Sequence, residues 1–407
     1  MTDAVAQAPA GERQADPGRG RFAAVIVVGH AVKHTLTSGV AAAIIPEIRR
    51  ELALTGTQVG SLGSVQQITG WMATMAAGYL GDRFTRKTSL MLTVSLSMVG
   101  LALLLLGVSG SYLMLVVAML CMGFGPSMFH PPAVGALSRR FADRRAFAIS
   151  LHGTGGSVGE VLGPLVAAGL VTVLYWRNVV RIEVIPALIA AVCMFTLLRE
   201  GAATQDGAPG SFRAYLRSFA RLLRQRALVL LLLASACRSV GQATTAIFLP
   251  IYLRENLGYA PALAGLYVSL SQLAGIGSQP LMGWLSDRFG HKQVILPALV
   301  TFTVLLTLVP LAPGRLALAA VILALGFFLF SMQSVLTSAA VDLGGREVHS
   351  TIVSLIYASG FVGSLAPTAA GALSDRYGLP SAFYMSAAVA ALAVVIVLFI
   401  RFPRRAT

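Results

Sequence analysis

Long apolar runs separated by short polar segments cover the chain from Phe22 to Phe402. Each run holds about 20 residues, which is the helical length needed to cross a bilayer core roughly 30 Å thick. The pattern therefore predicts an all-α membrane protein with twelve transmembrane helices. The expected spans are residues 22–46, 57–80, 88–108, 112–137, 146–174, 179–198, 227–252, 262–285, 292–312, 316–341, 350–373 and 381–402.

Polar segments divide these spans into two halves. Residues 1–21 are polar and lack an apolar core followed by a small-residue cleavage site, so we expect a disordered cytoplasmic tail rather than a signal peptide. Residues 199–226 form a central cytoplasmic linker, and residues 403–407 form a second cytoplasmic tail. The predicted domains are an N-terminal six-helix bundle at 22–198 and a C-terminal six-helix bundle at 227–402.

Within the linker, apolar and basic residues alternate over Ser211–Gln225 in the pattern of an amphipathic helix. Such a helix would rest its apolar stripe on an anionic leaflet and direct its arginines toward the lipid headgroups. A solvated linker helix is the alternative. The arginines concerned are Arg213, Arg217, Arg221 and Arg224.

The composition favours the membrane class, because 56% of the residues are hydrophobic, only 12% are charged and the mean hydropathy is +0.77. With both termini in the cytoplasm, 22 lysines and arginines fall in cytoplasmic segments and 7 in outer loops. This asymmetry satisfies the positive-inside rule and explains the net charge of +15 without a nucleic-acid partner. We expect a monomeric, multi-pass protein of the cytoplasmic (inner) membrane that contacts lipids and a small-molecule substrate.

The two halves resemble each other at an offset near 204 residues. GYLGDRFTRK (78–87) follows the second span, and GWLSDRFGHK (283–292) follows the eighth. GSVG (156–159) in the fifth span matches GFVG (360–363) in the eleventh. A six-plus-six duplication is the architecture in which two bundles rock about a site near the bilayer midplane. The repeat therefore predicts a pseudo-two-fold axis and alternating access.

GYLGDRFTRK resembles the loop signature of the major facilitator superfamily, commonly written G-x-x-x-D-R-x-G-R-K, with Thr85 in place of the usual glycine. The resemblance extends from about Phe22 to Phe402 and implies a transporter, not an enzyme. In that superfamily the aspartate of this loop is part of a conformational gate. A plain interfacial charge cluster is the alternative. The implied gate residues are Asp82, Arg83 and Arg86 in the first copy and Asp287 and Arg288 in the second.

Two stretches, FGPSMFHPP (124–132) and HGTGGSVG (152–159), are similar to the fosmidomycin-resistance branch of efflux transporters. That resemblance implies proton-coupled export of small drugs, including an anionic phosphonate. GEVLGPLVAA (159–168) also resembles the fifth-span signature of superfamily antiporters. Small residues at this spacing let helices approach closely, and a proline favours a bend. The residues concerned are Gly159, Gly163 and Pro164.

A basic cluster lies inside the first span, in GHAVKHTLTSG (29–39). His30, Lys33 and His34 share one face of a helix with 3.6 residues per turn. The repeat offset pairs His34 with Arg238 of the seventh span, and Gln242 lies one turn further on.

Basic groups at membrane depth are tolerated where they face a cavity or a partner. The two clusters therefore predict a central cavity for an anionic ligand, which Arg238 would hold by bidentate hydrogen bonds. In the alternative, Lys33 snorkels or pairs with Glu160, and the histidines bond to the backbone.

Three more polar groups lie at membrane depth. Glu160 is a lone carboxyl that either carries the coupling proton or tunes packing near an outer vestibule. His30 and His34 are also candidates for carrying the proton. His130 precedes a Pro-Pro kink, and we expect it and His152 to relay protons, contact substrate or pack by hydrogen bonds. Metal ligation is a rival, but two distant histidines without a nearby cysteine or aspartate make a poor ligand set, so we expect no metal.

The leading functional prediction is proton-coupled export (antiport) of a small anionic or amphiphilic compound by alternating access. The proton gradient would supply the energy, with no cofactor. The alternative is a proton-coupled symporter that imports an organic anion such as a monocarboxylate. A membrane enzyme is disfavoured, because the sequence has no H-E-x-x-H motif and only a short central loop.

Overall fold

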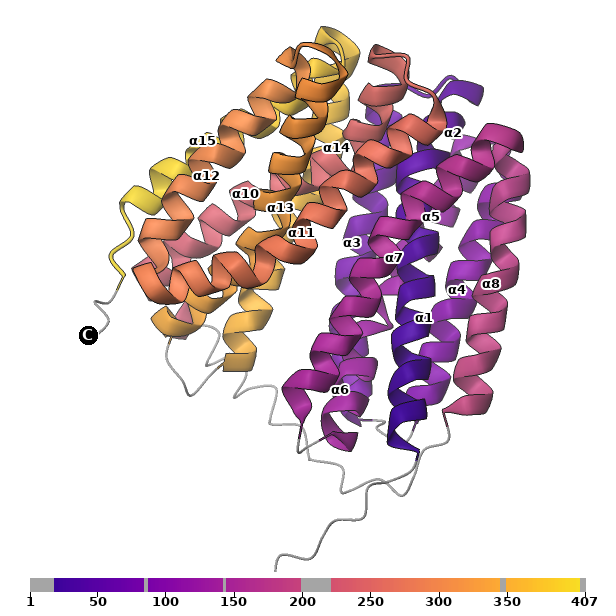
Figure 1. Cartoon of the computed structure of the whole chain (residues 1–407), viewed down its shortest axis with the longest axis horizontal. Helices are drawn as coiled ribbons and strands as arrows, with labels where there is room; N and C mark the ends of the chain where they lie inside the picture. Colours follow the sequence, from indigo (N-terminus) through magenta and orange to yellow (C-terminus); the bar gives the residue numbers. More distant parts are fainter. Residues whose placement is uncertain (1–17, 84–86, 142–143, 199–220, 345–348, 403–407) are drawn as a thin grey trace, which may run out of the picture.

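The computed structural model describes residues 18–83, 87–141, 144–198, 221–344 and 349–402, and these residues form helices joined by short connections, with no strand among them (Figure 1). The N-terminal half contains α1 (Arg19–Gly39), the π-helical turn η1 (Val40–Ile44), α2 (Ile45–Glu51), α3 (Gly56–Arg83), α4 (Thr88–Val108), α5 (Tyr112–Ser127), α6 (His130–Arg140), α7 (Arg145–Val173) and α8 (Trp176–Leu197). The C-terminal half contains α10 (Arg226–Ile251), the π-helical turn η3 (Tyr252–Asn256), α11 (Pro261–Phe289), α12 (His291–Leu308), the 3-10 turn η4 (Val309–Leu311), α13 (Gly314–Gly344), α14 (His349–Tyr377) and α15 (Pro380–Leu398).

Eight helical segments in the described part of the chain are long and apolar enough to cross a membrane. They are α4, α5 with α6, α7, α8, α10 with η3, α12 with η4, α13 and α15. The other long helices, α1, α3, α11 and α14, contain more polar residues. Helices α3, α11 and α14 contact the other half of the chain, and α1 packs against α7. Polar residues on these helices can therefore face other helices instead of lipid, which explains their lower hydropathy.

The two halves pack against each other through α3 with α14 and through α7 with α11. These two pairs are equivalent under the sequence repeat, since α3 corresponds to α11 and α7 corresponds to α14. Both crossings are close. A Cβ on Gly60 would lie 2.0 Å from the carbonyl oxygen of Pro367, and one on Gly265 would lie 2.6 Å from that of Pro164. The repeat seen in the sequence is therefore also present in the packing of the halves.

The halves touch at one end of the helices and diverge toward the other, where α8 ends and α10 begins (Figure 1). We call these the closed end and the linker end. At the closed end Arg254 pairs with Glu47 at 2.5 Å, and Arg49 pairs with Glu255 at 3.1 Å. Asp375 also accepts hydrogen bonds from the first residues of α3. The cross-half hydrogen bonds and ion pairs recorded among the described residues lie at this end or at mid-helix.

The fourth predicted span is interrupted where the sequence predicts a kink. Helix α5 ends at Ser127 and α6 begins at His130, followed by Pro131 and Pro132. Prolines fit the first turn of a helix because the backbone N–H groups there have no intrahelical partner. The break places His130 at the start of a new helix, beside α7.

Two sequence predictions concern residues largely outside the described part of the chain. The amphipathic helix at Ser211–Gln225 falls mostly within 199–220, and Arg86 falls within 84–86. Asp82 and Arg83 lie where α3 ends at the linker end, but their side chains are not described. The linker-helix and first-gate interpretations stay predictions.

Candidate functional site

A cavity of about 490 Å³ lies between the halves. Its lining comes from α1, η1, α3, α6 and α7 on one side and from α10, α11 and α13 on the other. Five residues singled out in the sequence contribute to the lining, namely His30, His34, His130, Glu160 and Gln242. The structure thus brings together basic, acidic and amide side chains that are far apart in the chain.

A second cavity of about 370 Å³ lies next to the first, with Gln242 and Ala246 lining both. Arg238 lines the second cavity rather than the first, together with Gln67 and Gln333. The sequence predicted a single cavity shared by His34 and Arg238, so the observed arrangement differs. Each predicted cluster has its own cavity, and Gln242 lies at their junction.

The two cavities are related by the repeat. His34 corresponds to Arg238 at the offset of 204, and Gln67 corresponds to Gln272 at 205. His34 and Gln272 line the first cavity, whereas Arg238 and Gln67 line the second. The duplicated fold therefore makes two equivalent cavities, one built on histidine and one on arginine.

Arg238 is 2% exposed and is held by neutral acceptors only. It donates to the carbonyl oxygen of Leu329 at 3.0 Å, to Gln242 Oε1 at 3.0 Å and to Gln333 Oε1 at 2.6 Å. Its Nε is buried without a hydrogen-bond partner. Within the described residues no carboxylate pairs with this guanidinium. A buried charge without a counter-charge is costly, which makes the site receptive to an anion.

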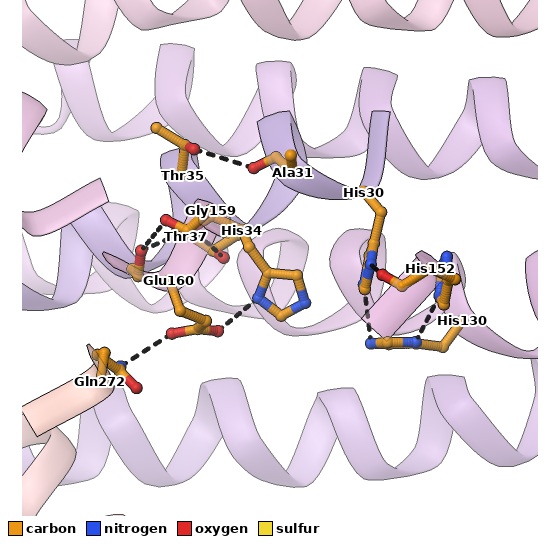
Figure 2. Close-up of polar contacts among 11 residues, drawn as sticks. His30, Ala31, His34, Thr35, Thr37, His130, His152, Gly159, Glu160 and Gln272 are labelled. Carbon is orange, nitrogen blue, oxygen red and sulfur yellow. Dashed lines mark hydrogen bonds and ion pairs between the residues drawn. The ribbon is translucent and has the colours of Figure 1, made fainter. Parts of the chain in front are cut away.

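Three histidines form a hydrogen-bonded network beside the first cavity, and the His34 ring contacts two of them, His30 and His130 (Figure 2). His30 Nε2 lies 3.1 Å from His130 Nε2, and His130 Nδ1 lies 3.1 Å from His152 Nε2. His30 Nδ1 donates to the backbone carbonyl oxygen of His152 at 2.7 Å. His152 is buried behind the cavity and does not line it. His130 and His152 are thus neighbours, and the distance assumed from the sequence was wrong.

The glycines of α7 make room for this network. A Cβ on Gly156 would lie 2.6 Å from His30 Cε1, and one on Gly159 would lie 2.2 Å from the carbonyl oxygen of Ala31. A Cβ on Gly163 would lie 2.1 Å from Ser38 Oγ. The predicted packing residues Gly159 and Gly163 therefore set α7 against α1. Pro164 stands inside α7, which continues through it to Val173.

Glu160 connects the two halves. It accepts a hydrogen bond from His34 Nδ1 in α1 and another from Gln272 Nε2 in α11, the latter at 2.9 Å (Figure 2). Gln272 was not singled out in the sequence, although its repeat partner Gln67 also lines a cavity. One carboxylate therefore joins three helices at the centre of the molecule.

Lys33 does not line either cavity, contrary to the sequence prediction. It is 2% exposed, and its ammonium lies 5.8 Å from the centre of the Phe129 ring. A residue three positions from His30 is rotated by about 60° around the helix, which suffices to turn it into the N-terminal bundle. Its place is a cation–π contact inside that bundle.

The second predicted gate lies at the linker end of α11. Asp287 and Arg288 are both exposed, and the Arg288 guanidinium lies 5.3 Å from the centre of the Trp284 ring. Nearby, His291 contacts Asp342 at 2.8 Å and joins α12 to α13. Their exposure suits groups that exchange partners, and the gating role stays a prediction.

Two bundles of membrane-length helices that meet at one end and hold polar cavities between them define a multi-pass membrane transport protein. The chain belongs to the Major Facilitator Superfamily, which its sequence matches over residues 28–240 and 231–407. The proteins of this superfamily are transporters and not, in general, enzymes. The sequence resemblance to this superfamily is therefore confirmed.

The chain is similar to curated transporters. It is 27% identical over 254 residues to the Fosmidomycin resistance protein of Escherichia coli (strain K12), an alignment covering 62% of this chain and 62% of that protein. It is 26% identical over 394 residues to the Probable sulfoacetate transporter SauU of Cupriavidus necator, covering 87% of each. The expected resemblance to the fosmidomycin-resistance branch is thus confirmed.

The fold is also found among solved structures. A bacterial homolog of the human lysosomal transporter Spinster, in an inward-facing and unoccupied conformation, superposes with a TM-score of 0.72 at 17% sequence identity. The match covers 95% of this chain and 96% of that one. At this identity the likeness concerns the fold alone.

Proposed function

We propose that the chain is a secondary active transporter that exports a small anionic or amphiphilic compound in exchange for protons. Twelve transmembrane helices in two six-helix bundles would alternate access to the cavities. The proton gradient would supply the energy, without a cofactor. The names of two relatives, a fosmidomycin resistance protein and a probable sulfoacetate transporter, support export and an anionic substrate respectively.

The observation that carries the proposal is the buried guanidinium of Arg238. A carboxylate, sulfonate or phosphonate would pair with it and accept from its unpartnered Nε. The site is large enough for a small molecule, because the two adjoining cavities measure about 490 and 370 Å³. Gln242 and Gln333 would fix the orientation of the guanidinium as the anion enters.

The surplus of basic residues at the linker end supports a cytoplasmic location for that end and for both termini, in the inner membrane. In that orientation the halves of this structure are closed toward the outside and diverge toward the cytoplasm (Figure 1). An exporter loads its substrate from the cytoplasm. A cavity beside Arg238 in this conformation is therefore where an exported anion would bind.

Transport in proteoliposomes with an imposed pH gradient tests this proposal. The probes are sulfoacetate, a monocarboxylate and a phosphonate, with a lipophilic cation for comparison. Arg238→Ala should reduce anion flux by about 30-fold or more, since removing one partner of a buried charge pair costs about 2–5 kcal/mol. Arg238→Lys should give an intermediate loss, because lysine keeps the charge but lacks the planar fork.

Arg315→Ala is the matched control, because Arg315 is an exposed arginine beside Tyr259 at the closed end. Its flux should equal that of the unmodified protein. Equal flux of every anion in Arg238→Ala would refute the anion site. The direction of the pH gradient that accelerates flux separates export from proton-coupled import.

A further inference from the structure

The histidine network has a property that transport of an anion at Arg238 does not require. One ligand atom each from His30, His34 and His130 lies within 4.8 Å of the other two. All three side chains line the first cavity. We propose that these three histidines form a binding site for a divalent transition-metal ion of the zinc class, with a further coordination position open to the cavity.

The hydrogen bonds around the cluster leave the same nitrogen of each ring available. His30 Nδ1 donates to the carbonyl oxygen of His152, and His34 Nδ1 donates to the Glu160 carboxylate. Histidines that bind metal characteristically donate their other N–H to a carbonyl or carboxylate oxygen, which leaves Nε2 as the ligand. The second ring nitrogen of His34 faces His30 and His130 (Figure 2).

His130 follows the same arrangement through His152. Its Nδ1 lies 3.1 Å from His152 Nε2, so a proton on that Nδ1 is donated to His152 and Nε2 is free for an ion. Without an ion, the Nε2 atoms of His30 and His130 share one hydrogen bond. On metal binding, the His130 proton resides on Nδ1 instead and the His152 proton moves from Nε2 to Nδ1, so the net protonation is unchanged.

The spacing of His30 and His130 is close to that of two ligands in a tetrahedral site. Zinc–imidazole bonds of about 2.0–2.1 Å place two tetrahedral nitrogen ligands roughly 3.3 Å apart. The observed separation of His30 Nε2 and His130 Nε2 is 3.1 Å. The His34 ring centre lies 4.6 Å from that of His30 and 5.8 Å from that of His130. His30 and His34 also have the i, i+4 spacing of helical zinc ligands.

The chemistry of the donors selects the class of ion. Three imidazoles suit zinc and its neighbours in the first transition series, whereas magnesium and calcium prefer oxygen ligands. Glu160 places a negative charge beside His34, which favours a cation. Lys33 opposes it, but its ammonium is directed to the Phe129 ring, inside the N-terminal bundle. Three protein ligands leave the fourth position of a zinc-class ion for water or a solute of the cavity.

Zinc binding to the purified full-length protein, stripped with a chelator, tests the proposal without any transport step. Competition with a chromophoric chelator should show one Zn²⁺ bound per chain. His34→Ala and His130→Ala should each weaken binding by more than about 10-fold, and Glu160→Gln by about 10- to 100-fold. His291→Ala is the matched control, because His291 is also buried and bonded to a carboxylate but lies outside the cluster.

X-ray absorption at the zinc edge of the unmodified protein provides a readout that depends on no variant. It should report about three imidazole nitrogens at roughly 2.0–2.1 Å. Absence of stoichiometric binding, a zinc shell dominated by oxygen, or equal loss of binding in His291→Ala would each overturn the metal site. Failure of anion transport would leave these measurements unaffected, so the two proposals fail separately.

Discussion

Replacing Asp375 by asparagine should shift the protein away from the conformation seen here. The carboxylate lies on α14 at the closed end and reaches the first turn of α3 in the other half. It accepts from the backbone N–H of Thr57 at 2.9 Å, from Thr57 Oγ1 at 2.6 Å and from the backbone N–H of Gly56. These hydrogen bonds can form only while the two halves touch at the closed end. Losing them therefore favours separation of the halves there.

The magnitude follows from the loss of one charge at a helix N-terminus. A carboxylate there contributes about 0.3–1 kcal/mol through the helix dipole, and its hydrogen bonds are stronger than those of a neutral amide. Because Asp375 is exposed, solvent screening limits the free energy lost on substitution to about 1 kcal/mol. Asparagine retains one acceptor oxygen and loses the charge. The ratio of open to closed molecules should therefore rise about fivefold.

Spin-label distance measurements across the closed end give this ratio. Leu113 and Leu316 are exposed residues of opposite halves at the closed end, and each is replaced by cysteine to carry a label. Glu51→Gln is the matched control, because Glu51 lies at the same end and its hydrogen bonds among the described residues stay within its own half, to Tyr175, Trp176 and Arg177. The native cysteines to be replaced by serine first are Cys121, Cys193 and Cys237.

An unchanged distance distribution in Asp375→Asn, or an equal shift in Glu51→Gln, would refute the stabilisation of the closed end by Asp375.

The pH dependence of the Asp375 contact adds a second check. Burial alone would raise the pKa of Asp375, but hydrogen bonds from Thr57 and Gly56, with the charge of Arg49, hold the pKa below its ordinary value of 3.8. The contact is therefore complete at neutral pH and is lost only as the pH falls through the lowered pKa. Distances in the unmodified protein should stay constant down to about pH 5.

Three more substitutions test the packing. Gly60→Val should also favour separation of the halves at the closed end, because the Cβ would lie 2.0 Å from the Pro367 carbonyl oxygen. The yield of cross-links across that end measures the separation. Gly159→Val should lower the melting temperature by about 1–4 °C, since overpacking α7 against α1 costs about 1–3 kcal/mol, and an unchanged value would contradict the close approach. Glu51→Gln should lower the melting temperature by about 1 °C through weaker bonds to Tyr175 and Arg177, with Glu47→Gln as a comparison at the same end.

Most of the correct predictions about the fold came from the internal sequence repeat. The offset of 204 makes Arg238 the equivalent of His34, and the structure places the two in separate cavities that adjoin at Gln242. The structure also shows equivalent glycines and prolines at the two crossings between the halves, where Gly60 meets Pro367 and Gly265 meets Pro164. These are properties of the backbone, which a repeat preserves.

Side-chain directions could not be predicted in the same way. Helical periodicity put Lys33 on the face of His30 and His34, but the ring of Phe129, in the turn between α5 and α6, gives its ammonium a place inside the bundle. The separation of the Arg238 cavity also depends on Leu329 and Gln333 of α13, which hold the guanidinium. Such contacts join residues distant in the chain, and no local pattern encodes them.

The histidine network shows the same limit. His30, His130 and His152 lie on three helices, so their spacing in the sequence gives no indication that they touch. The predicted Pro-Pro kink does explain why His130 starts a helix of its own. The glycines of α7 explain why His30 can approach His152. Only the packing of α1 with α7 combines the two features into one cluster.

Binding of a small anion at Arg238 can be measured without transport, by a thermal-stabilisation screen on the purified protein. The ligands are small carboxylates, sulfonates and phosphonates, set against lipophilic cations, at two pH values. One or more anions should raise the melting temperature of the unmodified protein and not that of Arg238→Ala. Stabilisation by lipophilic cations alone, or equal stabilisation of Arg238→Ala by the anions, would contradict anion binding at Arg238.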